Sequence, residues 1–169
     1  GAGQGLLASR LVCRGSADRL WSGDMVIERV VVVTPELLEA FNRLIPQLTD
    51  NSPPPRADDL DSILMSDSSV LLIAREPDAP GQIVGVGCLA IYRAPTGTRA
   101  VIEDVVVDQD SRGLGVGESL MRHLMEVARQ RGARGVSLTS NPRREAANRL
   151  YVRMGFGLRQ TNCYYCEFK

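Results

Sequence analysis

The residues best suited to chemistry stand together in the middle of the chain, in the run Arg112, Gly113, Leu114, Gly115, Val116 and Gly117. The apolar period that follows, with Leu120 and Leu124 on one face, predicts a helix that begins at the last of these glycines. The first turn of a helix has N–H groups without intrahelical partners and carries the positive end of the helix dipole. Glycines let a ligand approach this backbone closely, and arginine adds a fixed cation. The spacing therefore favours a bound anion, and a diphosphate in particular.

Two common nucleotide-binding motifs do not fit this turn. A dinucleotide fingerprint that starts at Gly113 would need a glycine where Glu118 stands. A P-loop would need a Gly-Lys pair, which the chain lacks. A tight glycine turn without a ligand, and a turn that binds another nucleotide, stay open as alternatives.

The elements around the turn are expected to alternate between strands and helices. Patterns rich in β-formers predict strands over residues 26–33, 69–75, 83–92, 100–107 and 135–139, followed by a closing hairpin that ends at Phe168. Helical periods, a Thr34-Pro35 start and glycine stops predict helices over residues 35–48, 58–65, 117–131 and 143–153. The order βααβββαβαββ predicts an α/β fold, with helices on both sides of a mixed sheet.

Three segments in this order resemble the GCN5-related N-acetyltransferase (GNAT) superfamily. Arg112, Gly115 and Gly117 match its signature of Arg or Gln, two residues, Gly, one residue, then Gly or Ala. Residues 102–107 resemble the family's fourth strand, and residues 150–156 resemble its Leu-Tyr-x-x-x-Gly-Phe segment. The resemblance implies a GNAT-like acyl-CoA N-acyltransferase fold and acetyl-CoA as cosubstrate, with no metal. It also implies that the turn holds the coenzyme A diphosphate, and that the main chain of the fourth strand holds the pantetheine arm through Val105, Val106 and Val107.

The same resemblance implies direct attack of an amine on the acetyl thioester, with no nucleophilic residue of the protein. It makes Tyr151 the candidate general acid. Glu103 is the candidate general base, acting through water, and Asp104 is the candidate for orienting or binding the substrate. Alternation along a strand predicts that these two carboxylates face opposite sides of the sheet. A solvated carboxylate at the sheet edge is the alternative for either one.

One position departs from the family pattern. Arg144 stands where the family often has a cofactor-binding asparagine. Asn148, which shares a helix with Tyr151, is the candidate that takes over this contact, and Asn141 and Arg144 itself are the alternatives. His123, the single histidine, is expected to be a solvated surface residue.

Composition bounds the kind of protein and its partners. The chain has 169 residues, 44% of them hydrophobic, and 20 basic and 20 acidic side chains give a net charge of zero. We expect one acetyltransferase domain over residues 25–169, preceded by an extension over residues 1–24 that does not belong to its core. A neutral chain with four scattered cysteines and no long apolar run predicts a cytoplasmic protein that binds neither nucleic acid nor a membrane.

The expected acceptor is a primary amine of a small molecule. Proline and acids between the first two helices, at Pro53, Asp58, Asp59 and Asp61, are expected near its cleft together with Tyr164 and Tyr165. A protein amine as acceptor, and a regulatory domain that binds coenzyme A without catalysis, are the competing functions. A homodimer is a further partner to be considered.

Overall fold

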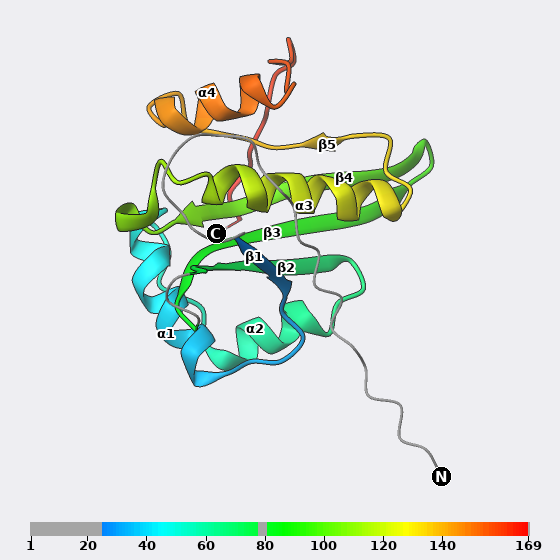
Figure 1. The fold of residues 1–169 in the computed structure, drawn as a ribbon. Helices are drawn as coiled ribbons and strands as arrows, with labels where there is room; N and C mark the ends of the chain where they lie inside the picture. The colour runs from blue at the N-terminus through cyan, green and yellow to red at the C-terminus, as the bar shows by residue number, and fades with distance from the viewer. Residues whose placement is uncertain (1–24, 78–80, 169) are drawn as a thin grey trace. The chain divides into compact units, whose positions relative to one another are not determined.

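The computed structural model describes residues 25–77 and 81–168. Five strands form one sheet in the order of the chain (Figure 1): β1 (Val26–Arg29), β2 (Ser69–Arg75), β3 (Ile83–Ala94), β4 (Gly97–Val107) and β5 (Val136–Ser137). The first four strands are antiparallel, and β5 runs parallel to β4. The helices are α1 (Pro35–Leu44), α2 (Ala57–Leu64), α3 (Val116–Gln130) and α4 (Glu145–Arg153), with 3-10 turns η1 (Ile45–Gln47) and η2 (Gln109–Ser111). The α/β class with a mixed sheet is confirmed; the expected extension, residues 1–24, lies outside the described residues.

The backbone divides into two compact units between Leu138 and Thr139. The first unit contains the whole sheet with α1, α2 and α3, and the second contains α4. Across the described ranges, no helix combines the length and the apolar character needed to cross a bilayer.

One face of the sheet is covered by α3, and two glycines of β3 allow the close packing. A Cβ atom at Gly85 would lie 3.0 Å from Leu120 Cδ1 and 3.1 Å from Val116 Cγ1, and one at Gly87 would lie 3.0 Å from Leu124 Cδ1. These separations are too short for a side chain on either glycine. The N-terminal half of α3 therefore lies directly on β3, with Leu120 and Leu124 fully buried.

The opposite face of the sheet packs against α1 and α2. Apolar side chains from both helices and three strands form one buried cluster that includes Phe41, Leu44, Leu60, Leu71 and Val86. Helix α1 begins as its sequence predicts, because the Thr34 hydroxyl accepts from the Leu37 amide at 3.2 Å and Pro35 occupies the first turn.

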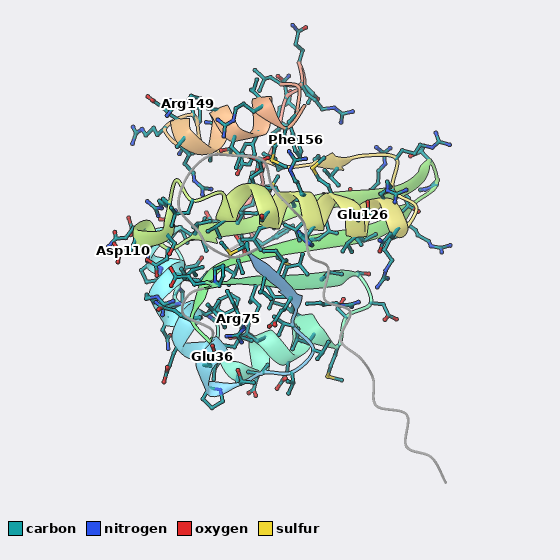
Figure 2. The ribbon with its side chains drawn as sticks, in the orientation of Figure 1. Glu36, Arg75, Asp110, Glu126, Arg149 and Phe156 are labelled. Atoms are coloured by element: carbon teal, nitrogen blue, oxygen red, sulfur yellow. The ribbon has the colours of Figure 1, made fainter. Side chains whose placement is uncertain are left out.

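An arginine at the end of β2 ties α1 to the sheet, as Figure 2 shows for Arg75 and Glu36. Arg75 also forms an ion pair with Glu28 of β1 at 3.0 Å and donates to the carbonyl of Gly81. Both carboxylates raise the pKa of Arg75, and the hydrogen bond that Arg75 donates to Glu36 makes the largest contribution. The three elements are thus fixed around one guanidinium.

Two expectations are wrong, one about the closing hairpin and one about the exposure of His123. The closing hairpin does not form, and residues 156–168 contain no strand. Almost all of their side chains are exposed, and a two-stranded hairpin without packing is marginal in water. The CYYC segment, Cys163 to Cys166, is therefore not part of a sheet. His123 is only 8% exposed, and its Nδ1 lies 2.8 Å from the Ser119 carbonyl oxygen. It lies three residues after Leu120 on the buried side of α3, where helical spacing places it.

Candidate functional site

The glycine turn lies where β4 ends and α3 begins. Gly113 and Gly115 have φ angles of +80° and +83°, in the left-handed region that favours glycine, and Gly115 is the N-cap of α3. A Cβ atom at either glycine would meet no protein atom within 4 Å. Conformation rather than crowding thus requires glycine here, and the space above the turn is open to a ligand.

Hydrogen bonds to the end of β4 and to two side chains from other segments hold this turn in place. Arg112 Nε donates to the Val107 carbonyl at 3.1 Å, so its cation is folded back toward the end of β4. Gln47 Oε1 accepts from the Gln109 amide at 2.8 Å and from Arg112 at 3.4 Å. The hydroxyl of Ser111, which is buried, donates to Glu76 at 2.9 Å. The turn is a fixed structure.

A partly buried ion pair supports the base of the turn. Asp108 is 6% exposed, and its Oδ2 lies 2.7 Å from Arg43 Nε of α1. Burial raises the pKa of Asp108, but the Arg43 hydrogen bond, with help from the Asp110 amide, outweighs it and leaves the pKa below its ordinary value. The carboxylate therefore stays charged and holds α1 against the start of η2.

The amides at the start of α3 have no acceptor in the described part of the protein. Among the described residues, none accepts a hydrogen bond from the amides of residues 116–118. The first carbonyl that accepts a bond from the helix is that of the N-cap Gly115, to which the Ser119 amide donates at 2.9 Å. These amides and the helix dipole favour an anion at the open face above Gly113 and Gly115. Residues 113–117 form the turn that the sequence predicts, while a role of the turn and of Arg112 in binding a ligand stays a prediction.

The last residues of β4, just before the glycine turn, lie beyond the part of the strand that pairs with β5. Strand β5 pairs with β4 only through Ala100 and Val101, while β4 continues to Val107. The predicted pantetheine-binding residues Val105, Val106 and Val107 lie in this outer part of β4. The side chain of Val106 is buried in the core, so contacts with a ligand there would come from the main chain.

A β-bulge interrupts β4 beside this segment. Val86 pairs with Val106 and Cys88 pairs with Glu103, so β4 has one more residue than β3 between these pairs. The extra residue is accommodated at Asp104, whose φ of +51° is the only positive value among the described non-glycine residues. The expected alternation of Glu103 and Asp104 is therefore wrong, because the bulge breaks it.

Both carboxylates lie near one cysteine of β3. Burial is the largest cause that raises the pKa of the Cys88 thiol to about 11, and the charges of Asp104 and then Glu103 contribute to the same rise. Burial, followed by the charge of Asp104, raises the pKa of Glu103. A carboxylate with a raised pKa is better suited to accept a proton near neutral pH than an ordinary one.

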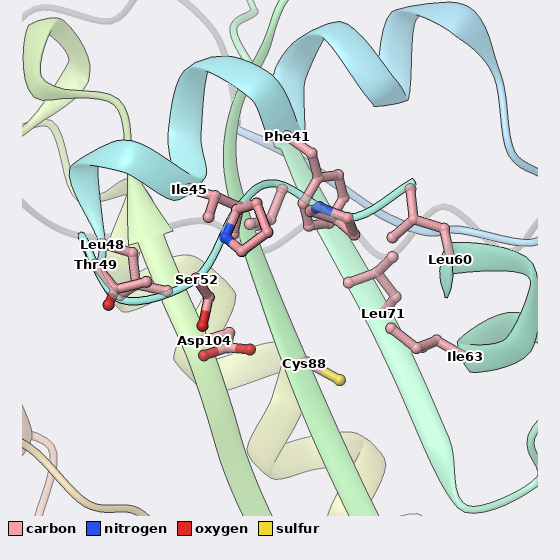
Figure 3. A pocket seen from close by; sticks show the side chains of 13 residues that line it. Phe41, Ile45, Leu48, Thr49, Ser52, Leu60, Ile63, Leu71, Cys88 and Asp104 are labelled. Carbon is pink, nitrogen blue, oxygen red and sulfur yellow. The ribbon is translucent and has the colours of Figure 1, made fainter. Parts of the chain in front are cut away.

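A pocket of ≈ 230 Å³ lies between the sheet and the first two helices (Figure 3). Side chains of α1 and α2 and of the loop between them form its outer wall, and its floor consists of Leu71, Val86, Cys88 and Asp104. Pro53 lines the pocket as expected, but Asp58, Asp59 and Asp61 are exposed and do not. Asp59 instead accepts from the Arg56 amide at the start of α2.

The remaining predicted residues belong to the second unit. Tyr151 on α4 is buried, and this burial raises the pKa of its hydroxyl despite the opposing charge of Arg144. Its ring contacts Phe156 with centroids 5.9 Å apart. Asn148 Nδ2 donates to the Asn141 carbonyl at 3.0 Å and so holds the loop before α4. Tyr164 and Tyr165 are exposed.

The described residues form an α/β protein with a mixed sheet, in which a glycine turn joins β4 to α3 and β5 pairs with only two residues of β4. The model of the Acetyltransferase (GNAT) family matches residues 36–156, and the chain belongs to this family. Members of this family use acetyl-CoA. The resemblance noted in the sequence is thereby confirmed.

Several relatives carry the names of specific acetyltransferases. A probable glucosamine 6-phosphate N-acetyltransferase 2 of Oryza sativa subsp. japonica is 36% identical over 57% of this chain and 58% of its own. A glucosamine 6-phosphate N-acetyltransferase of Trypanosoma brucei brucei is 43% identical over 45% of this chain and 52% of its own. The chain thus spans a little over half the length of these relatives. The crystal structure of a Trypanosoma brucei acetyltransferase is 27% identical, with a TM-score of 0.67 over 85% of this chain and all of that one.

Sequence reasoning missed three residues of the site. Arg43 of α1 and Gln47 of η1 stabilise the glycine turn although they are far away in sequence, and no local pattern marks them. Cys88 was only one of four scattered cysteines in the sequence. Its position becomes informative only through its pairing with Glu103.

Proposed function

We propose that the protein is an N-acetyltransferase that moves an acetyl group from acetyl-CoA to a primary amine of a small molecule. The observation that carries the proposal is the glycine turn, which presents free amides at the start of α3 beside the open end of β4. Residues 112–117 would bind the diphosphate, and the main chain of residues 105–107 would bind the pantetheine arm. Acetyl-CoA, when bound, supplies the acetyl group as a thioester.

The residues of this chain would then bind the amine and carry out the proton transfers. Asp104 binds the ammonium group, and Glu103 accepts one of its protons through water, so that the neutral nitrogen attacks the thioester carbonyl. The C–N bond forms as the C–S bond breaks. Tyr151 gives its proton to the leaving thiolate, which is reasonable because its raised pKa keeps the hydroxyl protonated. Asn148 contacts the cofactor from α4.

The setting of this reaction is part of the proposal. A single acetyltransferase domain over residues 25–169, with residues 1–24 outside its core, acts in the cytoplasm on a free small molecule, without a metal, nucleic acid or a membrane. A second copy of the chain is its further candidate partner. Acetylation of a protein amine is the second candidate function, and coenzyme A binding without catalysis is the third.

A thiol-release assay separates these functions. The protein is mixed with acetyl-CoA and, in turn, with small amines, peptides or buffer alone, and free coenzyme A is measured with a thiol reagent. We expect release that depends on a small amine. Release with peptides only would favour the protein substrate, and coenzyme A binding without release from any amine would leave the regulatory function.

A further inference from the structure

The pocket beneath α1 and α2 has a charged end and an apolar end. We propose that the acyl acceptor is a small primary amine with an apolar body, an aromatic ring or a branched alkyl group, whose ammonium group binds at Asp104. The inference rests on the proposed acetyl transfer and names the class of its acceptor.

Strand pairing fixes the direction of the pocket. Leu71 of β2 pairs with Cys88 of β3, and Cys88 pairs with Glu103 of β4. These residues form a row across three strands, and since neighbouring strands lie about 4.8 Å apart, the row is roughly 10 Å long. Asp104 follows at the β4 end, and Figure 3 shows it beside the loop residue Ser52, while Leu71 lies toward α2. The ammonium and the body of a bound amine would occupy different ends.

The end of the pocket at β2 offers only apolar contacts. Phe41, Leu60 and Leu71 are buried and line it together with Ile63. Cys88 in the middle of the row keeps its proton at neutral pH, because its pKa is raised to about 11. A neutral thiol behaves as a small hydrophobic group, so this part of the pocket suits a hydrocarbon body.

The charges of the lining disfavour a phosphorylated sugar. Asp104 is the single charged side chain among the described residues that line the pocket. Of the arginines on the two helical segments over the pocket, Arg43 pairs with Asp108 at 2.7 Å and Arg56 with Asp59 at 3.4 Å. Among these described lining residues a phosphate would meet a carboxylate and no cation, and sugar hydroxyls would lose water against apolar walls. The substrate in the relatives' names does not fit this lining.

The size of the pocket limits the body to a single ring or its equivalent. An apolar cavity of roughly 150 Å³ holds benzene. The ≈ 230 Å³ found here therefore accommodates one ring with a short amine-bearing arm. Larger oligosaccharide amines would have to remain outside it.

An acceptor panel tests the inference. With saturating acetyl-CoA, kcat/KM is measured for 2-phenylethylamine, 3-methylbutylamine, glucosamine 6-phosphate and spermidine. We expect the two apolar amines to exceed the other two by about tenfold or more, as expected for a few carbon atoms buried in an apolar pocket. Preference for glucosamine 6-phosphate or spermidine would overturn the inference and leave acetyl transfer intact. If no amine is acetylated, the transfer itself fails, and thermal stabilisation by 2-phenylethylamine alone decides whether the pocket binds this class.

Two truncations on the same helix provide the matched control. Ile63 lines the pocket, whereas Met65, at the end of α2, is 86% exposed and lies outside the lining. Ile63→Ala is expected to raise KM for 2-phenylethylamine about tenfold and Met65→Ala to leave it unchanged. Coenzyme A affinity, measured for both variants, shows that each is folded. Equal KM values in two variants with normal coenzyme A affinity would contradict the proposed position of the apolar body.

Discussion

Glu103 on β4 lies opposite Cys88 on β3, and the strand breaks its alternation at the next residue. Asp104 takes up the extra residue of the bulge with a φ of +51° and lines the pocket. A regular strand would turn Glu103 and Asp104 to opposite faces. The bulge instead brings both negative charges close enough to Cys88 to raise its pKa. Bulges often serve this purpose of redirecting a side chain beside a site.

The effect of Asp104 on the pKa of Glu103 predicts a shift in the pH profile of kcat/KM when Asp104 is neutralised. Burial and the charge of Asp104 both raise the pKa of Glu103. In Asp104→Asn the second cause disappears, so the pKa of Glu103 falls and the base is deprotonated at lower pH. The acidic limb of kcat/KM should therefore move to lower pH, even though weaker amine binding lowers the rate at every pH.

Glu103→Gln completes this test, since a glutamine cannot accept the proton and the acidic limb should vanish. Asp110→Asn, an exposed carboxylate after the end of β4, serves as the control and should keep the wild-type profile. An acidic limb that persists unchanged in Glu103→Gln would assign the base to another group.

Tyr151→Phe tests the proposed general acid. Loss of the hydroxyl should lower kcat by about 100-fold, because proton transfer from a positioned side chain contributes on this scale. Coenzyme A affinity should stay near that of the wild type. Tyr92→Phe, which removes the hydroxyl of a half-exposed tyrosine on β3, should change neither quantity. Equal turnover in the wild type and Tyr151→Phe would leave the tyrosine with a packing role only.

Arg43→Ala tests the support of the glycine turn. Removal of the guanidinium leaves the buried Asp108 carboxylate unpaired, and we expect the free energy of unfolding to fall by about 1–3 kcal/mol at pH 7. The folded pKa of Asp108 lies below the unfolded value of about 3.9. The contribution of the pair is therefore complete above about pH 4 and disappears as the pH falls through the folded pKa.

Urea unfolding of both proteins at several pH values measures this dependence. The difference between wild type and Arg43→Ala should shrink on acidification. A difference that stays constant down to the acid limit would show that lost packing of the arginine, and not the ion pair, causes the destabilisation.

Local signals in the sequence account for most of the fold. Thr34 and Pro35 start α1, the glycines start α3, and strand-rich runs place β2 and β3 close to their observed bounds. Each of these signals acts within one turn or one hairpin, so a single segment carries it.

The site depended on longer-range relations that the sequence does not display. The positive φ of Asp104 arises from the pairing of β4 with β3, and no pattern in the sequence of residues 102–107 predicts it. The burial of His123 depends on how closely α3 packs against the sheet, and Gly85 and Gly87 of β3 allow that close packing. The apolar end of the pocket likewise combines residues from α1, α2 and β2.

The most direct measurement compares coenzyme A affinity in two glycine variants of α3. Gly115 at its start and Gly132 after its end have φ of +83° and +81°, and a Cβ atom at either would meet no protein atom within 4 Å. Gly115→Ala and Gly132→Ala thus impose the same backbone strain. By calorimetric titration we expect Gly115→Ala to weaken coenzyme A binding by about tenfold, or 1.4 kcal/mol, and Gly132→Ala to match the wild type. Equal affinities in the two variants would contradict the assignment of the turn as the coenzyme A site.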